Sequence, residues 1–254
     1  MNTILKSKAV FIIGAALSFL CIIATVYAQA TSSNSKAEIF LDPANKENVS
    51  GYAYISFARG DRLTTSFDIK RGLINLKEAM LKWTNIDTRL DNPIWLSSPS
   101  LKKLPFVYVA FDKGLELTEP EKKNIQEYLL NGGFMVLEDI SRPIETNPAV
   151  SQFKKVFEDV IQSHGRFAPI SNDHPLYHSF FDFTDGPPRG AETNMVEIRE
   201  LEGVTIDGRL AAIYSRKRYV IKWNETANND PQLRMGINML VFALRQKGGI
   251  AQAK

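Results

Sequence analysis

The sequence predicts an α/β domain with a mainly parallel sheet and helices on both faces. The first observation behind this class is a strand–helix–strand unit between Phe106 and Ile140. The second is that short apolar runs alternate with amphipathic segments along the chain as far as Leu244. This alternation is typical of folds in which helices cover both faces of a parallel sheet.

The central unit starts with the apolar run Phe106–Phe111, which is too short for a helix and indicates a strand buried on both faces. Thr118 and Glu121 have the spacing of a capping box, which predicts that a helix begins there. Residues 131–133, Asn-Gly-Gly, favour a left-handed stop, and 134–137 form a second apolar run. A strand, a helix and a strand over this length predict two parallel strands with a right-handed crossover.

The remaining elements follow from the same patterns of hydrophobic spacing and turn residues. Strands are expected at residues 52–58, within 86–95, at 209–214 and at 219–223. Helices are expected to contain the stripes Leu73–Trp83 and Phe153–Ile161, the latter after an Asn147-Pro148 cap, and to run from Asp230 to Leu244.

The N-terminus resembles an export signal. Lys6 and Lys8 precede the apolar run 9–27, and Ala28-Gln29-Ala30 fits an Ala-x-Ala cleavage site, so residues 1–30 are predicted to be a secretory signal peptide. The protein is then periplasmic or secreted. Because the apolar run is long enough to span a bilayer, an uncleaved inner-membrane anchor formed by residues 9–27 is the alternative.

Removal of residues 1–30 would also remove Cys21, the only cysteine, and with it any disulfide, thiolate nucleophile or cysteine metal ligand. The formal charge would fall from +3 to +1, so no nucleic-acid partner is expected. Basic clusters such as 216–218 are predicted to face water. Residues 31–50 are polar and are predicted to be a linker, 51–247 a single α/β domain and 248–254 a tail.

Candidate ligand-binding residues follow from the rule that open α/β sheets bind ligands outside the carboxyl ends of their strands. Arg59 is expected to follow the first strand, and Glu138 and Asp139 the central one. Two adjacent carboxylates leaving a buried strand are suited to binding a cation or acting as a base, or else they cap a solvent-facing turn.

A second candidate region contains Asp173, His174 and His178. Two histidines four residues apart would share one face of a helix, as a zinc pair needs, but Pro175 lies between them and no third ligand follows at a recognised spacing. The segment more often forms a turn. No metal is therefore expected. The sequence also has no nucleophile elbow and no phosphate-binding glycine loop, and no cofactor is expected.

From about Tyr52 to Leu244 the sequence resembles the domain of unknown function 4159 family. The resemblance rests on the order and spacing of several short motifs: Leu117-Thr118 with Glu121, Tyr128-Leu129, 131–134, Glu138-Asp139, Asp173-His174-Pro175 with Tyr177-His178, Gly203, 207–210 and 236–238. It implies a flavodoxin-like three-layer sandwich related to class I glutamine amidotransferases and trehalose-utilisation proteins, in a bacterial envelope protein. It implies no reaction.

The chain departs from these relatives in two ways. The amidotransferases carry a nucleophilic cysteine, which the mature chain lacks, so glutamine hydrolysis by that route is excluded. Family members also tend to have a glycine- and aspartate-rich run before the tryptophan that Trp223 matches, where this chain has 219–222, Tyr-Val-Ile-Lys. A polar pocket at that edge would be altered. Trp223 is counted among the ligand-binding candidates on this resemblance.

Two functions remain open. The first, which we favour, is a non-catalytic envelope domain that binds an unknown envelope protein or small ligand. The second is a hydrolase of an envelope or carbohydrate substrate, with Asp139 and either His174 or His178 as base and orienting acid. Both place Arg59, Asp139 and a histidine in one shared cleft.

Overall fold

The computed structural model describes residues 36–42, 44–112, 116–141, 148–192 and 198–252. The predicted signal peptide, residues 1–30, and the helix cap at Asn147 lie outside the described residues. Among the described residues, no helix is long and apolar enough to cross a membrane.

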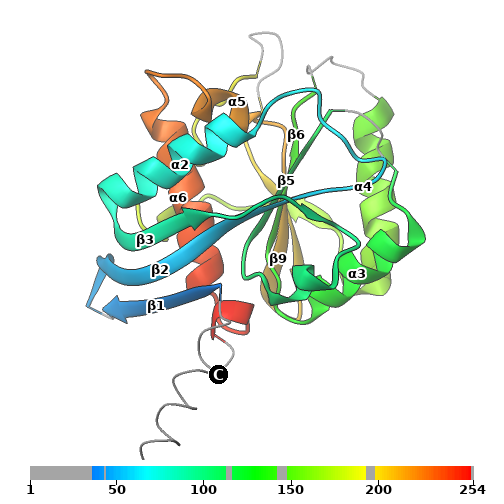
Figure 1. Cartoon of the computed structure of the whole chain (residues 1–254), viewed down its shortest axis with the longest axis horizontal. Coiled ribbons are helices and arrows are strands. Elements are labelled where there is room, and N and C mark those ends of the chain that lie inside the picture. The colour runs from blue at the N-terminus through cyan, green and yellow to red at the C-terminus, as the bar shows by residue number, and fades with distance from the viewer. Residues whose placement is uncertain (1–35, 43, 113–115, 142–147, 193–197, 253–254) are drawn as a thin grey trace, which may run out of the picture. The chain divides into compact units, whose positions relative to one another are not determined.

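The described chain forms a mixed α/β domain around one nine-stranded sheet (Figure 1). The strands are β1 (Ala37–Asp42), β2 (Asn45–Arg59), β3 (Asn85–Leu90), β4 (Ile94–Trp95), β5 (Val107–Phe111), β6 (Met135–Asp139), β7 (Phe167–Pro169), β8 (Glu202–Ile206) and β9 (Arg209–Ser215). The helices are α2 (Lys70–Trp83), α3 (Glu119–Leu130), α4 (Pro148–Ile161), α5 (Tyr219–Trp223) and α6 (Asp230–Arg245).

The strand order is β1-β2-β5-β6-β9-β8-β7, and β3 and β4 also pair with β2. The pairs among β2, β5, β6 and β9 are parallel, as are those of β3 and β4 with β2. Antiparallel pairs occur at the margins, where β1 pairs with β2 and where β7, β8 and β9 pair in sequence. The centre of the sheet is thus parallel, as the sequence predicts.

The sequence also predicts the central β5-α3-β6 unit correctly. Every residue of β5 is buried, and β5 pairs in parallel with β6. The backbone N–H of Thr118 donates to the Glu121 carboxylate at 2.8 Å, which forms one half of the capping box. At the other end of α3, Gly132 has a φ of +95°, the left-handed conformation that ends helices and that glycine adopts without strain.

Helices pack on both sides of the sheet. Tyr108 and Ala110 of β5 belong to a hydrophobic cluster that includes residues of α2, α5 and α6. Val107, Val109 and Phe111, which point the other way, belong to a second cluster with residues of α3 and α4. Figure 1 shows the same division, with α2, α5 and α6 on one side of the strands and α3 and α4 on the other.

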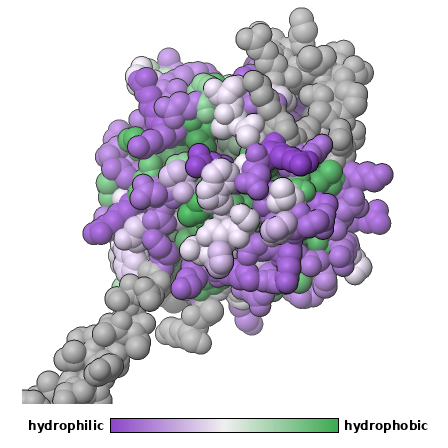
Figure 2. All heavy atoms as spheres, turned by 45° about the vertical axis from the view of Figure 1, so that its right-hand side comes forward, coloured by the Kyte–Doolittle hydropathy of each residue, from purple (hydrophilic) through white to green (hydrophobic). Residues whose placement is uncertain are grey.

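Little of this apolar surface reaches the face shown in Figure 2. That face is mainly hydrophilic, and its hydrophobic side chains form small separate patches. The apolar residues of the two clusters are instead buried between the sheet and its helices.

Two sequence predictions about the fold are wrong. Residues 36–50, predicted to belong to a linker, contain β1 and the first part of β2. The polar composition of this segment suggested a linker, but it is explained by the position of β1 at the margin of the sheet, where much of the strand faces water. The predicted strand at 219–223 is the helix α5. Its buried residues, Tyr219, Val220 and Trp223, have helical rather than alternating spacing.

Candidate functional site

Glu138 lies at the carboxyl edge of the sheet but is completely buried. Its side chain accepts hydrogen bonds from the backbone N–H groups of Tyr219 at 2.8 Å and Val220 at 2.9 Å. The hydroxyl of Ser215 donates to it at 3.1 Å, and the phenol of Tyr108 also donates to it. Glu138 thus satisfies the first N–H groups of α5, which explains why that segment is a helix.

The environment of Glu138 has opposing effects on its acidity. Burial raises the pKa of Glu138, because a charged carboxylate loses its hydration, while the hydrogen bonds from Tyr108, Val220, Tyr219 and Ser215 act in the opposite direction. The net direction is upward. Burial and the charge of Glu138 also raise the pKa of the Tyr108 phenol well above its usual value.

Asp139 is 5% exposed and is held by residues close to it. One carboxylate oxygen accepts the N–H of Ser141 at 2.9 Å and the Ser141 hydroxyl at 2.6 Å. The other accepts the hydroxyl of Tyr214 at 3.2 Å. Asp139 therefore caps the turn that follows β6, but neither it nor Glu138 faces water as the alternative of a solvent-facing turn supposes.

Lys217 is buried, so the prediction that residues 216–218 face water is wrong for this residue. It is 3% exposed, and its ammonium group lies 3.3 Å from the buried carboxylate of Glu192. Next to it, Arg218 adopts a φ of +58° and donates hydrogen bonds to the carbonyl oxygens of Ile140 at 3.1 Å and Ala191 at 2.9 Å. These contacts hold the segments that follow β6 and β9 together at the carboxyl edge.

Arg59 ends β2 at the same edge, but its guanidinium lies over the ring of Trp95, 4.1 Å from the ring centre. Among the described residues, no ion pair joins Arg59 to Asp139. A separate hollow of about 520 Å³ is lined by residues that include Glu192, Lys222 and Gln232, and neither Arg59 nor Asp139 lines it.

The two histidines line a different and larger cleft. Its volume is about 620 Å³, and its walls come from the start of β2, the 173–179 segment, the start of β9 and the end of α6. The lining residues are Lys46, Asp173, His174, Pro175, His178, Ser179, Gly208, Arg209, Leu210, Phe242, Arg245, Gln246 and Lys247.

The cleft lies at the edge of the sheet opposite Glu138 and Asp139. Arg209, which lines it, is the first residue of β9, whereas Ser215, the last residue of β9, is aligned with Glu138. Seven residues of strand separate the two edges by roughly 20 Å. The structure therefore does not bring Arg59, Asp139 and a histidine into one cleft, and the acid–base pair required by the hydrolase hypothesis is not formed.

His174 is fixed in one tautomer within the cleft. Its Nδ1 accepts the backbone N–H of Leu176 at 3.1 Å, so in the neutral ring the proton lies on Nε2. The ring also lies 5.4 Å from that of Phe242, centre to centre. Burial lowers the pKa of His174, only partly offset by the charge of Asp173. The neutral ring can donate one hydrogen bond from Nε2.

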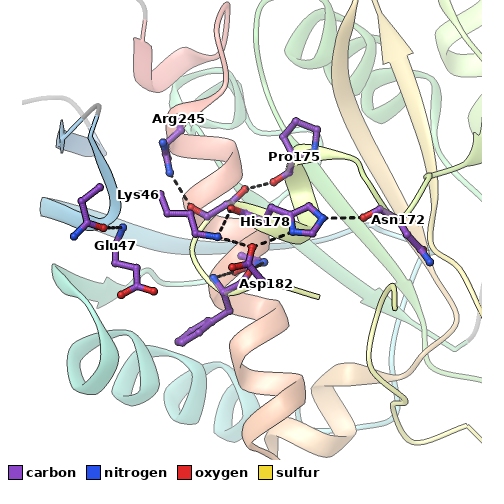
Figure 3. A network of polar contacts seen from close by, with 11 residues as sticks. Lys46, Glu47, Asn172, Pro175, His178, Asp182 and Arg245 are labelled. Carbon is purple, nitrogen blue, oxygen red and sulfur yellow. Dashed lines mark hydrogen bonds and ion pairs between the residues drawn. The ribbon is translucent and has the colours of Figure 1, made fainter. Parts of the chain in front are cut away.

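His178 belongs to a polar network that joins three separate parts of the chain, as Figure 3 shows. Its Nε2 lies 2.9 Å from the carbonyl oxygen of Asn172, and its Nδ1 lies 3.0 Å from the carboxylate of Asp182. The ammonium group of Lys46, from the start of β2, reaches the same Asp182 oxygen at 2.5 Å. On the other side, Arg245 of α6 donates to the carbonyl oxygen of Ser179 at 2.8 Å.

The third expected residue of this region, Asp173, is exposed, and its carboxylate accepts a hydrogen bond from the Ser171 hydroxyl. That bond lowers the pKa of Asp173. Among the described residues that line the cleft, Asp173 is the only acid. No group of three or more His, Cys, Asp and Glu side chains in the described part of the chain is arranged to hold a metal ion.

The charge of the cleft comes mainly from residues that no sequence motif marks as part of a site. Lys46, Arg209, Arg245 and Lys247 line it together with Asp173, and Lys46 is already paired with Asp182. These residues are separated by up to 201 positions in the chain, and no local motif connects them. Arg209 is partly engaged, since its guanidinium donates to the carbonyl oxygens of Gly133, at 2.7 Å, and Leu129.

Trp223, the remaining ligand-binding candidate, lies in the core with 1% exposure. Its indole N–H donates to the carbonyl oxygen of Gln232 at 2.7 Å, and its ring lies 5.4 Å from that of Tyr108. Its immediate neighbours are therefore residues of the protein itself.

The described chain is thus a mixed α/β domain that carries an open, basic cleft at the amino edge of its parallel strands. Residues 53–244 match the family model described as "Domain of unknown function (DUF4159)". The chain belongs to this family, as the resemblance in its motifs predicts. No curated protein matches the chain.

Proposed function

We propose that this domain is a non-catalytic binding module for a small anionic ligand, which occupies the basic cleft. The observation that carries the proposal is the charge of the lining: Arg209, Arg245 and Lys247 outnumber Asp173, while Lys46, which also lines the cleft, is paired with Asp182. Clefts lined by one sign of charge concentrate ligands of the opposite sign. The volume of about 620 Å³ is in the range of small-molecule sites.

The chemistry of the lining narrows the class of ligand. Arg245 and Lys247 supply charged donors suited to a carboxylate or phosphate, and the Nε2–H of His174 adds a neutral donor. Leu210 and Phe242 supply an apolar wall. A compact organic anion, with a carboxylate or phosphate group on an apolar body, fits this combination.

A non-catalytic role is favoured over hydrolysis. A hydrolase using Asp139 needs a histidine within hydrogen-bond reach, and both histidines of the cleft lie at the opposite edge of the sheet. The ring nitrogens of His178 face Asn172 and Asp182, which ties this histidine to a structural network.

The fold supports a finer classification, as a flavodoxin-like three-layer sandwich of the amidotransferase-like group. If β2, β3, β5, β6 and β9 are counted as strands one to five, their order across the sheet is 2-1-3-4-5. That is the strand order of flavodoxin-like folds. The antiparallel strands β7 and β8 extend this arrangement beyond β9.

Export to the cell envelope is a further part of the proposal. It rests on Lys6, Lys8, the apolar run 9–27 and the site 28–30. N-terminal sequencing of protein from the periplasmic fraction should find a chain that begins at Thr31. A chain that begins at Met1 and is extracted only by detergent would show that the segment is an anchor.

Calorimetric titration tests the ligand class, with inorganic phosphate, citrate and benzoate as probes at low ionic strength. Binding should weaken as salt is added, because the attraction is electrostatic. The double variant Arg245→Gln, Lys247→Gln should bind at least about tenfold more weakly, equivalent to about 1.4 kcal/mol. The matched control is Lys102→Gln, Lys103→Gln, which removes two charges outside the cleft and should bind as the wild type does.

Two results would contradict the proposal. The first is the absence of salt-sensitive binding for all three anions. The second is equal loss of affinity in the cleft variant and in the control variant, because this would show that net charge rather than the cleft attracts the anion.

A further inference from the structure

The two histidines of the basic cleft are held by hydrogen bonds of different kinds. Nδ1 of His174 accepts the backbone N–H of Leu176 at 3.1 Å, so this nitrogen cannot carry a proton while the bond is kept. Both ring nitrogens of His178 instead lie next to oxygen atoms. The surroundings of His174 therefore favour a neutral ring, and those of His178 differ.

The partners of the His178 ring are acceptors on both sides (Figure 3). Nε2 lies 2.9 Å from the carbonyl oxygen of Asn172, and Nδ1 lies 3.0 Å from the carboxylate of Asp182. The hydrogen bond from Lys46 and that from His178 lower the pKa of the Asp182 carboxyl. A carbonyl oxygen and an ionised carboxylate accept hydrogen bonds and cannot donate them.

Only the charged form of the ring makes both of these bonds. A neutral imidazole carries one N–H, so either tautomer leaves the other nitrogen facing an oxygen with no proton between them. The imidazolium carries two N–H groups and donates to both oxygens. The geometry around His178 thus favours the protonated ring.

Charged groups approach His178 from several elements of the described chain. The carboxylate of Asp182 is in direct contact with the ring, and the charge of Asp173 interacts with it from the same segment. The ammonium group of Lys46, at the start of β2, reaches the same Asp182 oxygen at 2.5 Å. Arg245 of α6 donates to a main-chain carbonyl oxygen at 2.8 Å. The two acids favour the imidazolium, and the two cations oppose it from contacts with oxygen atoms rather than with the ring.

Protonation of His178 changes the charge of the cleft that it lines. With a neutral ring, the ammonium of Lys46 and the carboxylate of Asp182 balance each other. With an imidazolium, both cations share that one carboxylate, and the group carries one positive charge. The protonated cleft therefore attracts an anion more strongly than the neutral one.

We propose that the binding of an anion in the basic cleft is coupled to protonation of His178, so that the anion is held more tightly at acidic than at alkaline pH. The inference rests on the proposed function, because it concerns the same site. Histidine is the residue type whose charge changes between about pH 5 and 8. By linkage, a bound anion favours the imidazolium as much as the imidazolium favours the anion.

The coupling is small because the network is open to water. The side chains of His178 and Asp182 are 29% and 58% exposed, and solvent weakens charge interactions at such positions. We expect protonation of His178 to raise the affinity for benzoate about two- to fivefold. By reciprocity, bound benzoate should raise the midpoint of the His178 titration by about 0.3–0.7 pH units, the logarithm of the same ratio.

Calorimetric titration with benzoate at about pH 5.5 and about pH 8, at constant low ionic strength, tests the coupling. Benzoate is ionised at both pH values, so its own charge does not change. The ratio of the two affinities should be about two- to fivefold larger in the wild type than in His178→Gln, which cannot titrate. His164→Gln, at an exposed position outside the cleft, is the matched control and should keep the ratio of the wild type.

NMR titration of the histidine rings in the wild-type protein tests the reciprocal effect without a substitution at His178. Saturating benzoate should move the midpoint of His178 to higher pH and leave that of His164 unchanged. An unchanged His178 midpoint, or the same ratio of affinities in the wild type and in His178→Gln, would overturn the coupling while leaving the anion site in place. Absence of benzoate binding at both pH values would overturn the anion site and the coupling together.

Discussion

The carboxylate of Glu138, at the end of β6, accepts the backbone N–H of Tyr219, at the start of α5, at 2.8 Å. This bond joins residues 81 positions apart and, with the bond from Val220 to the same carboxylate, caps a helix from a neighbouring strand. A buried acid at this position therefore has a structural explanation that requires no ligand.

Glu138→Ala should lower the free energy of unfolding by about 3 kcal/mol or more. The backbone N–H groups of Tyr219 and Val220 would lose their acceptor, at about 1–3 kcal/mol for each unsatisfied group. Denaturation by urea measures the change. The control Glu78→Ala, at an exposed position of α2 in a surface ion pair, should change the stability by less than about 1 kcal/mol.

The raised pKa of Glu138 gives a specific pH dependence. Because the folded-state pKa lies above the unfolded value, near 4.5, the folded protein holds this proton to higher pH than the unfolded chain does. Its contribution to stability is therefore present below pH 4.5 and is lost as the pH rises through the folded-state pKa. Glu138→Gln cannot titrate, so the stability of the wild type relative to this variant should decrease from pH 4.5 upward. A difference that increases with pH would contradict the assignment.

The contribution of His174 to stability should change with pH in the opposite direction to that of Glu138. Burial lowers its folded-state pKa below the unfolded value of 6.5, so its contribution to stability is present above pH 6.5 and is lost as the pH falls through the folded-state pKa. His174→Asn keeps an acceptor for the N–H of Leu176 but does not titrate. Thermal unfolding across this pH range should show the wild type losing stability relative to the variant on acidification. Parallel curves would show that His174 does not contribute.

Gly72→Ala should destabilise the protein although alanine is the better helix former by about 1 kcal/mol. A Cβ at Gly72, in α2, would lie 2.7 Å from the carbonyl oxygen of Val220 in α5, so the two helices would have to move apart. We expect a loss of about 1–3 kcal/mol, measured by urea denaturation. The exposed Glu78→Ala on the same helix serves again as control, and a stabilising Gly72→Ala would show that the two helices are not in contact.

Local patterns in the sequence were sufficient for most elements. The β5-α3-β6 unit follows from an apolar run, a capping box and Asn131-Gly132, features whose physical causes lie within a few residues. α6 follows from Asp230-Pro231 and its hydrophobic spacing in the same way. α5 could not be predicted by these means, because its cap, Glu138, comes from a distant strand.

The sequence by itself thus determined the α/β class, the parallel centre of the sheet and the family, because these depend on local spacing and on the order of motifs. It also pointed to His174 and His178 as residues of a candidate site. Only the tertiary structure decided which charges surround them. Lys46, Arg209 and Arg245 meet at one cleft because β2 and β9 begin, and α6 ends, at the same edge of the sheet, whereas Asp139 lies at the other. Strand order and direction set that placement, and both depend on long-range packing.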